Sequence, residues 1–219
     1  MALIDRTLAE LAATLPGAAH IFTRHQLDFC RDGQQPLRTA CLEAGLDAAT
    51  IAAQLEALQD NARSEPDLRN AASDTLIDYI LTRFHTRHRE QFPALIRLAS
   101  RVEQVHSHST DCPHGLAEHL WNMQQELESH MRKEEKILFP LLRNDPAHPH
   151  ALAPIAVMRF EHDQHGEALA CLAELTNGLT PPADACSTWR ALYSGLAALR
   201  ADLVQHIHLE NNLLFARLA

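Results

Sequence analysis

Two ten-residue stretches decide the fold of this chain: residues 130–139 read HMRKEEKILF and residues 206–215 read HIHLENNLLF. Both follow the pattern His-x3-Glu-x3-Leu-Phe, and they start 76 residues apart (206 − 130). On an α-helix, residues i and i+4 lie on the same face, one turn apart. The pattern therefore predicts two helices, each of which turns one histidine and one glutamate toward the same side.

A second repeat accompanies the first. Residues 84–88 read FHTRH and residues 161–165 read EHDQH, so that His85 and His162 occupy matching positions 77 residues apart (162 − 85). Each of these histidines precedes a His-x3-Glu pattern by 45 or 44 residues. An internal repeat of this length predicts two similar helix pairs related by a pseudo-two-fold axis.

The rest of the chain fits an all-α fold. Only seven glycines occur, and no segment shows sustained two-residue alternation. Four long helices are expected at 74–106, 113–143, 154–177 and 184–219, separated by breaks rich in Pro, Gly and Asp. This pattern predicts an antiparallel four-helix bundle over 74–219. A small helical domain over 1–62 and a linker over 63–73 precede it.

Two prolines fall inside the predicted bundle helices. We expect Pro93 and Pro140 each to kink its helix or to end it locally, because proline lacks the backbone N–H.

Composition excludes several classes of protein. The net charge of −9 comes without a long basic stretch, which argues against nucleic-acid binding. The apolar runs are far shorter than the ~20 residues that span a bilayer, so no membrane segment is expected. The five cysteines are scattered without a Cys-x-x-Cys pair, which favours reduced thiols in the cytoplasm.

The 15 histidines call for an explanation that surface solvation does not give. A charged glutamate that faces a bundle core is costly unless it is paired or binds a cation. Two metal ions bridged by the two glutamates resolve this cost and leave coordination positions open. The predicted ligands, with His88 as an alternative to His85, are His85, His130, Glu134, His162, His206 and Glu210. Donors of this kind without thiolate suit iron or manganese, and zinc stays an alternative.

Other polar residues receive plainer interpretations. His88, His165 and His208 are expected beside the site, whereas His106 and the other loop histidines are expected to be solvated. The carboxylates of Glu126, Glu128, Glu135 and Glu161 are interpreted as surface groups or as partners that support the ligands from behind. Trp121 and Trp189 are interpreted as residues of the core or of an interface.

The sequence resembles the hemerythrin-like bundles, and more narrowly the RIC (repair of iron centres) family of iron–sulfur cluster repair proteins. The resemblance rests on residues 84–85, 129–140, 161–163 and 206–212, and on an N-terminal segment, LDFC at 27–30 followed by Gly33. It implies two iron ions joined by an oxo or hydroxo bridge, held by the six residues named above. It also implies a cytoplasmic bacterial protein that helps to repair clusters damaged by nitrosative or oxidative stress.

The resemblance leaves the chemistry of the site open. Nitric oxide or dioxygen is the expected small ligand, and damaged iron–sulfur proteins are the expected clients. Whether the centre reduces nitric oxide or donates iron, and therefore whether the protein is an enzyme, is not decided. The alternative is a scavenger or sensor of nitric oxide or dioxygen without repair activity. The oligomeric state is also open, with a homodimer as one option.

The N-terminal segment departs from the family in one position. Members of the family often carry two adjacent cysteines there, whereas Arg31 follows Cys30 in this chain. Cys30 is a candidate nucleophile or transient iron ligand, because a neighbouring guanidinium favours the thiolate. A disulfide between neighbouring cysteines is not available to it.

Overall fold

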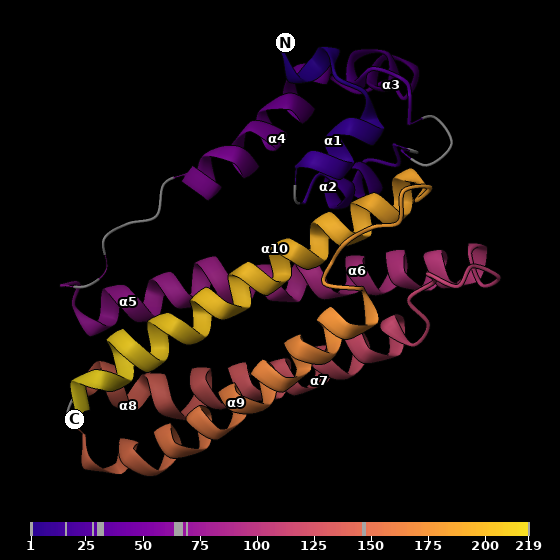
Figure 1. The fold of residues 1–219 in the computed structure, drawn as a ribbon. Helices are drawn as coiled ribbons and strands as arrows, with labels where there is room; N and C mark the ends of the chain where they lie inside the picture. Colours follow the sequence, from indigo (N-terminus) through magenta and orange to yellow (C-terminus); the bar gives the residue numbers. More distant parts are fainter. Residues whose placement is uncertain are drawn as a thin grey trace. The chain divides into compact units, whose positions relative to one another are not determined.

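The computed structural model describes residues 2–15, 17–27, 29, 33–63, 68, 70–145 and 148–218. The described residues form helices, turns and loops, with one isolated β-bridge between Thr7 and Pro36, so the predicted all-α class is confirmed. They divide into two compact units: residues 1–65 with 97–114 and 176–198, and residues 66–96 with 115–175 and 199–219. Figure 1 shows the helices of both. Among the described helices, none combines the length and the apolar character that crossing a membrane requires.

The first unit contains the short N-terminal helices. They are η1 (Leu3–Asp5), α1 (Leu8–Thr14), α2 (Ala18–Arg24), α3 (Leu37–Glu43) and α4 (Ala48–Arg63). Thr7 and Glu10 form a reciprocal capping box at the start of α1. Asp47 accepts hydrogen bonds from the backbone N–H groups of Ala49 and Thr50 and so caps α4, as its place in the sequence predicts. The core of this unit includes Leu8, Leu11, Phe22, Leu37, Ile51 and Leu55, all at most 1% exposed.

His106 also lies in the first unit, and the prediction that it is solvated is wrong. Its Nε2 lies 3.3 Å from the Sγ of Cys186, and its ring packs 4.8 Å from the indole of Trp189. Trp189 is a core residue, whereas Trp121 on the bundle surface is 54% exposed. Packing against a buried tryptophan explains why a histidine next to a loop is half-buried.

The second unit is a bundle of four helical rods. The first rod is α5 (Ser73–Ile80), η2 (Leu81–His85) and α6 (Thr86–Val105), and the second is α7 (Leu116–Lys133), η3 (Glu134–Leu138) and α8 (Phe139–Asn144). The third is η4 (Pro149–Ala151) and α9 (Leu152–Leu175), and the fourth is α10 (Ser187–Leu209), η5 (Glu210–Leu214) and η6 (Phe215–Leu218). Residues 97–105 of α6 and 187–198 of α10 belong to the first unit.

Contacts at the ends of the rods show that neighbours run antiparallel. Helix α5, which begins the first rod, contacts α8 at the end of the second rod and η5 near the end of the fourth. An apolar cluster fills this end of the bundle, and its buried members include Leu76, Ile80, Phe84, Phe139, Met158 and Phe215. The bundle predicted from the repeat is therefore confirmed in class and topology.

Three of the rods contain a π-helical turn, in which the backbone N–H donates to the carbonyl five residues earlier. The N–H of Thr86 bonds to the carbonyl of Leu81 in η2, Phe139 to Glu134 in η3, and Phe215 to Glu210 in η5. Such turns are frequently found at functional sites. All three adjoin the histidines and glutamates of the repeat.

The two prolines behave differently from one another. Helix α6 runs through Pro93 without ending, so of the two outcomes expected there the local end of the helix is wrong. Pro140 stands in the first turn of α8, immediately after η3, where the hydrogen-bond pattern of the rod has already changed. A proline costs little there, because its missing N–H falls at a position that needs no regular α-helical partner.

Candidate metal centre

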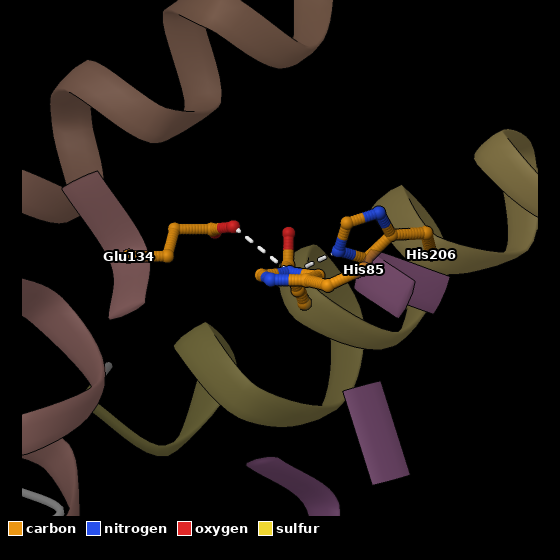
Figure 2. A group of neighbouring side chains, drawn as sticks. His85, Glu134 and His206 are labelled. Atoms are coloured by element: carbon orange, nitrogen blue, oxygen red, sulfur yellow. Dashed lines mark hydrogen bonds and ion pairs between the residues drawn. The ribbon is translucent and has the colours of Figure 1, made fainter. Parts of the chain in front are cut away.

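Six side chains from the four rods meet inside the bundle. They form two sets of four, and within each set the potential ligand atoms lie within 4.8 Å of one another: His85, Glu134, His206 and Glu210, and His130, Glu134, His162 and Glu210. Every member is buried. Figure 2 shows His85, Glu134 and His206 directed toward one another from different rods. The structure thus brings together all six residues that the repeat singled out, and the two sets share both glutamates.

The π-helical turns place these side chains. His85 is the last residue of η2, Glu134 is the first of η3, and Glu210 is the first of η5. His130 and His206 stand one turn before the two glutamates on the same rods, as the i, i+4 spacing predicts. His162 comes from α9, a regular helix.

The carboxylate of Glu210 reaches both sets with different oxygens. Its Oε1 lies 3.0 Å from the Nε2 of His206, and its Oε2 lies 3.0 Å from the Nε2 of His162. A carboxylate with one oxygen in each set can bind one cation through each oxygen. Glu210 therefore has the geometry of a bridging ligand.

Glu134 occupies the corresponding position on the second rod. Its Oε2 lies 3.4 Å from the Nε2 of His85 and 3.5 Å from the Nε2 of His130. Both of its oxygens are buried without a hydrogen-bond partner among the described residues. A buried carboxyl group in this state is costly, and a cation relieves the cost.

The imidazole nitrogens are spaced as donors to shared cations. The Nε2 atoms of His130 and His162 are 3.2 Å apart, although two neutral imidazoles have no strong reason to hold these atoms together. Two nitrogens that bind the same metal ion, each at about 2.1 Å, lie about 3 Å apart. The residues present therefore fit a metal pair.

Burial sets the protonation of the site. Desolvation, with the nearby His206, lowers the pKa of His85 to about 4, and desolvation lowers the pKa of His130 to about 2. Both imidazoles are therefore neutral at pH 7, which is the form that binds a metal.

The two glutamates differ in protonation. Burial, reinforced by the charge of Glu210, raises the pKa of Glu134 well above its usual range. Burial opposes ionisation of Glu210 as well, but His206 and His162 outweigh it and hold its pKa well below the usual range. The shorter contacts of Glu210 to imidazole nitrogens support this order. The pKa values of the two glutamates are therefore shifted in opposite directions, and Glu134 binds a proton more readily than Glu210.

Three of the four imidazoles are oriented by an oxygen atom that contacts Nδ1. The Nδ1 of His85 lies 2.8 Å from the Oε1 of Glu135, and the Nδ1 of His130 lies 3.0 Å from the Oε2 of Glu161. The Nδ1 of His162 lies 3.1 Å from the Oδ1 of Asn211. These contacts fix the tautomer in which Nδ1 donates and Nε2 is free for a metal. Glu135 and Glu161 thus support ligands, one of the two roles that the sequence left open to them.

Two further histidines lie next to the site without joining either set. His88 is fully buried, and its ring packs 5.4 Å from that of His206. His165 is 4% exposed and packs edge-on against His130 at 5.0 Å. The Nε2 of each is buried and without a hydrogen-bond partner among the described residues. His208, which the sequence also placed beside the site, is exposed and bonds to Asn212.

No pattern in the sequence predicts the charged network that contacts His88. Asp202, which is 5% exposed, accepts hydrogen bonds from Arg83 at 2.7 Å, from Arg87 at 2.6 Å and from Gln91 at 2.7 Å. The amide oxygen of Gln91 in turn lies 3.2 Å from the Nδ1 of His88. The partners are more than 100 residues apart in the chain, and only the fold joins them. Cys30 lies outside the described residues.

A four-helix bundle that buries two shared glutamates among four imidazoles defines a class of metal-binding helical protein. Residues 76–218 match the family model of the hemerythrin HHE cation binding domain, and residues 4–59 match ScdA_N, a domain of unknown function (DUF542).

Relatives with full-length similarity narrow the assignment. The iron–sulfur cluster repair protein YtfE of Pectobacterium atrosepticum is 48% identical over 217 residues, which cover 99% of this chain and 98% of the relative. The YtfE proteins of Edwardsiella ictaluri and of Yersinia pseudotuberculosis are 47% and 46% identical, and each alignment covers 97% of this chain and 96% of the relative. The chain belongs to the YtfE family of hemerythrin-like proteins.

Proposed function

We propose that the six buried residues hold two iron ions. His85 and His206 bind one ion, His130 and His162 bind the other, and Glu134 and Glu210 bridge the two. The observation that carries this proposal is the pair of ligand sets that share both glutamates. Imidazole and carboxylate donors without thiolate suit iron better than a soft metal.

We propose further that the protein helps to repair iron–sulfur clusters damaged by nitrosative or oxidative stress. Support comes from relatives named for this repair, which align with almost the whole chain at 46–48% identity. Damaged iron–sulfur proteins are then the clients, and nitric oxide or dioxygen is the small ligand of the centre.

The chain's own residues prepare the site for this role. When bound, the metals supply open coordination positions and one-electron redox chemistry. Glu135, Glu161 and Asn211 keep three imidazoles in the tautomer that presents Nε2. Glu134 releases a proton when it takes up a cation, so loading of the centre is coupled to pH.

The N-terminal part belongs to the same proposal. The matched ranges 4–59 and 76–218 support a division into a small domain over 1–62, a linker over 63–73 and a bundle over 74–219. We assign Cys30 a thiol role in transfer or gating, and we place the protein in the cytoplasm. The four described cysteines are free thiols, in line with a reducing compartment.

Metal analysis with matched variants tests the site. The purified wild-type protein is expected to hold about two iron ions per chain and to show an absorption band of an oxo-bridged centre that changes with nitric oxide. Glu134→Ala and Glu210→Ala are expected to lose most of the iron. The control is Glu118→Ala, an exposed glutamate on α7. Iron near two per chain in both core variants would refute the assignment.

A repair assay tests the function separately. A nitrosylated cluster protein, freed of nitric oxide, is incubated with the loaded protein, and recovery of its activity is followed. A repair protein restores activity, whereas a scavenger or sensor restores none, because no free nitric oxide is left to remove. The Glu210→Ala variant serves as the metal-poor control.

A further inference from the structure

The two metal positions differ in how their ligands are supported. In the set of His130 and His162, both imidazoles have an oxygen partner at Nδ1, at 3.0 Å from Glu161 and at 3.1 Å from Asn211. In the set of His85 and His206, only His85 has one, at 2.8 Å from Glu135. The Nδ1 of His206 is buried and has no hydrogen-bond partner among the described residues.

Packing takes the place of the missing hydrogen bond. The ring of His206 lies parallel to that of Phe84, with 5.3 Å between the centroids and 1° between the planes, and His88 packs nearby. Aromatic contacts of this kind fix the plane of a ring. They do not accept a proton from Nδ1, so they do not make Nε2 a stronger donor to a metal.

The carboxylate of Asp202, on the same helix as His206, already has other partners. Asp202 stands one turn before His206 on α10, but its carboxylate accepts from two guanidinium groups and one amide. Arg83 and Arg87 hold it away from the role that Glu135 and Glu161 play for the other imidazoles. The lack of an acceptor at His206 is therefore built into the packing of the first and fourth rods.

The bridging glutamates do not compensate for the difference. Glu210 is 3.0 Å from one imidazole nitrogen in each set. Glu134 is 3.4 Å from one and 3.5 Å from the other. Because the carboxylates serve both positions equally, the support of the imidazoles decides which position binds more tightly.

We propose that the metal position formed by His85 and His206 is the weaker of the two, and that its ion is the exchangeable one. This inference rests on the two-metal centre proposed above and identifies which ion can leave for a client cluster. Loss of one supporting partner typically lowers metal affinity by about 10- to 100-fold. We expect a difference of that size between the positions.

Zinc titration of the metal-free protein, followed by nitrogen NMR of the histidine rings, tests the order of filling. At one equivalent of Zn²⁺, the Nε2 signals of His130 and His162 are expected to shift, while those of His85 and His206 stay at their metal-free values. The second equivalent is expected to shift the remaining pair. Filling of the His85 and His206 pair first, or equal shifts of all four at one equivalent, would overturn the inference.

Two neighbouring asparagines provide a matched pair of variants. Asn211→Leu removes the partner of His162 and is expected to bring the two affinities together, so that one equivalent shifts all four signals in part. Asn212→Leu, which loses only an exposed contact to His208, is expected to keep the wild-type order. An unchanged order in Asn211→Leu would count against the role assigned to the Nδ1 partners.

The stoichiometry separates this inference from the function on which it rests. If the protein binds two zinc ions per chain but fills both positions in parallel, only the proposed difference in affinity between the two positions is refuted. Saturation at one or none refutes the two-metal centre itself, and the inference with it.

Discussion

Glu134 and Glu210 match each other in the repeat, yet their replacement by glutamine is expected to change stability in opposite directions. Burial and the charge of Glu210 raise the pKa of Glu134 well above its usual range. The unfolded chain ionises this group near the ordinary value of 4.5. A raised carboxyl pKa lowers stability at pH 7 by at most about 1.36 kcal/mol for each of the 2.5 pH units between 4.5 and 7, which sets an upper limit of roughly 3 kcal/mol.

Glu134→Gln removes this cost and keeps the shape of the side chain. The metal-free variant is expected to be more stable than the wild type by up to about 3 kcal/mol at pH 7, although it binds little metal. The sign follows from the direction of the shift. A raised carboxyl pKa lowers stability only at pH values above the pKa of the same group in the unfolded chain. Removing the carboxyl group therefore gains less than about 0.5 kcal/mol at pH 4.5.

Glu210→Gln is the matched control. The pKa of Glu210 is held well below its usual range, and its Oε1 lies 3.0 Å from the Nε2 of His206, so the change removes a charge-assisted contact. A loss of about 2 kcal/mol is expected at pH 7. Urea unfolding of chelator-treated samples at pH 7 and pH 4.5 measures both effects. A destabilised Glu134→Gln variant at pH 7, or a gain of equal size at both pH values, would refute the raised pKa of Glu134.

The remaining predictions concern pH and packing. Between pH 6 and 5 the metal-free protein is expected to lose about 3–4 kcal/mol of unfolding free energy in urea titrations. Each of three buried imidazoles with a pKa of about 4 or lower stays neutral while the unfolded chain takes up protons, which costs about 1.2 kcal/mol per imidazole. The three are His85, His130 and His165. The lowered pKa of His88 and the raised pKa of Glu134 act in opposite directions. A flat pH dependence would contradict the lowered pKa values of these histidines. Asp202→Ala is expected to cost about 3–5 kcal/mol, because it leaves Arg83 and Arg87 unpaired, whereas Asp202→Asn should cost less. Trp189→Ala is expected to cost about 3–5 kcal/mol of unfolding free energy by opening a cavity in the first unit. Thermal or urea unfolding measures this loss, and a change below about 1 kcal/mol would show that the neighbouring side chains collapse into the cavity.

The sequence predicted the bundle and the six side chains that meet inside it because both depend on local periodicity. A histidine four residues before a glutamate shares its face in any helix, and the repeat shows which faces meet. The support of these ligands was only partly predictable. Glu135 and Glu161 were recognised as candidates because they adjoin ligands in the chain, but nothing in the sequence paired Asn211 with His162.

Contacts between distant segments account for what the sequence did not reveal. Asp202 lies 119 residues from Arg83 in the chain, and neither residue belongs to a motif. His106 was predicted to be solvated from its place near a loop, but the packing of Trp189 covers it. Helix α6 continues through Pro93, although a proline removes one backbone hydrogen bond from the helix.

The π-helical turns carry a consequence for the tolerance of the chain to insertions and deletions. Each such turn holds one residue more than an α-helical turn, and one residue corresponds to about 100° of rotation along a helix. Deleting a single residue from η3 would therefore restore a regular α-helical turn and leave the later side chains of the second rod on nearly the same faces. Phe139 and Leu142, which are buried at this end of the bundle, would stay turned inward. A one-residue deletion in a regular turn of the rod would instead rotate them by about 100°. The π-helical turns are therefore the places where a rod can lose one residue without turning its apolar end toward solvent.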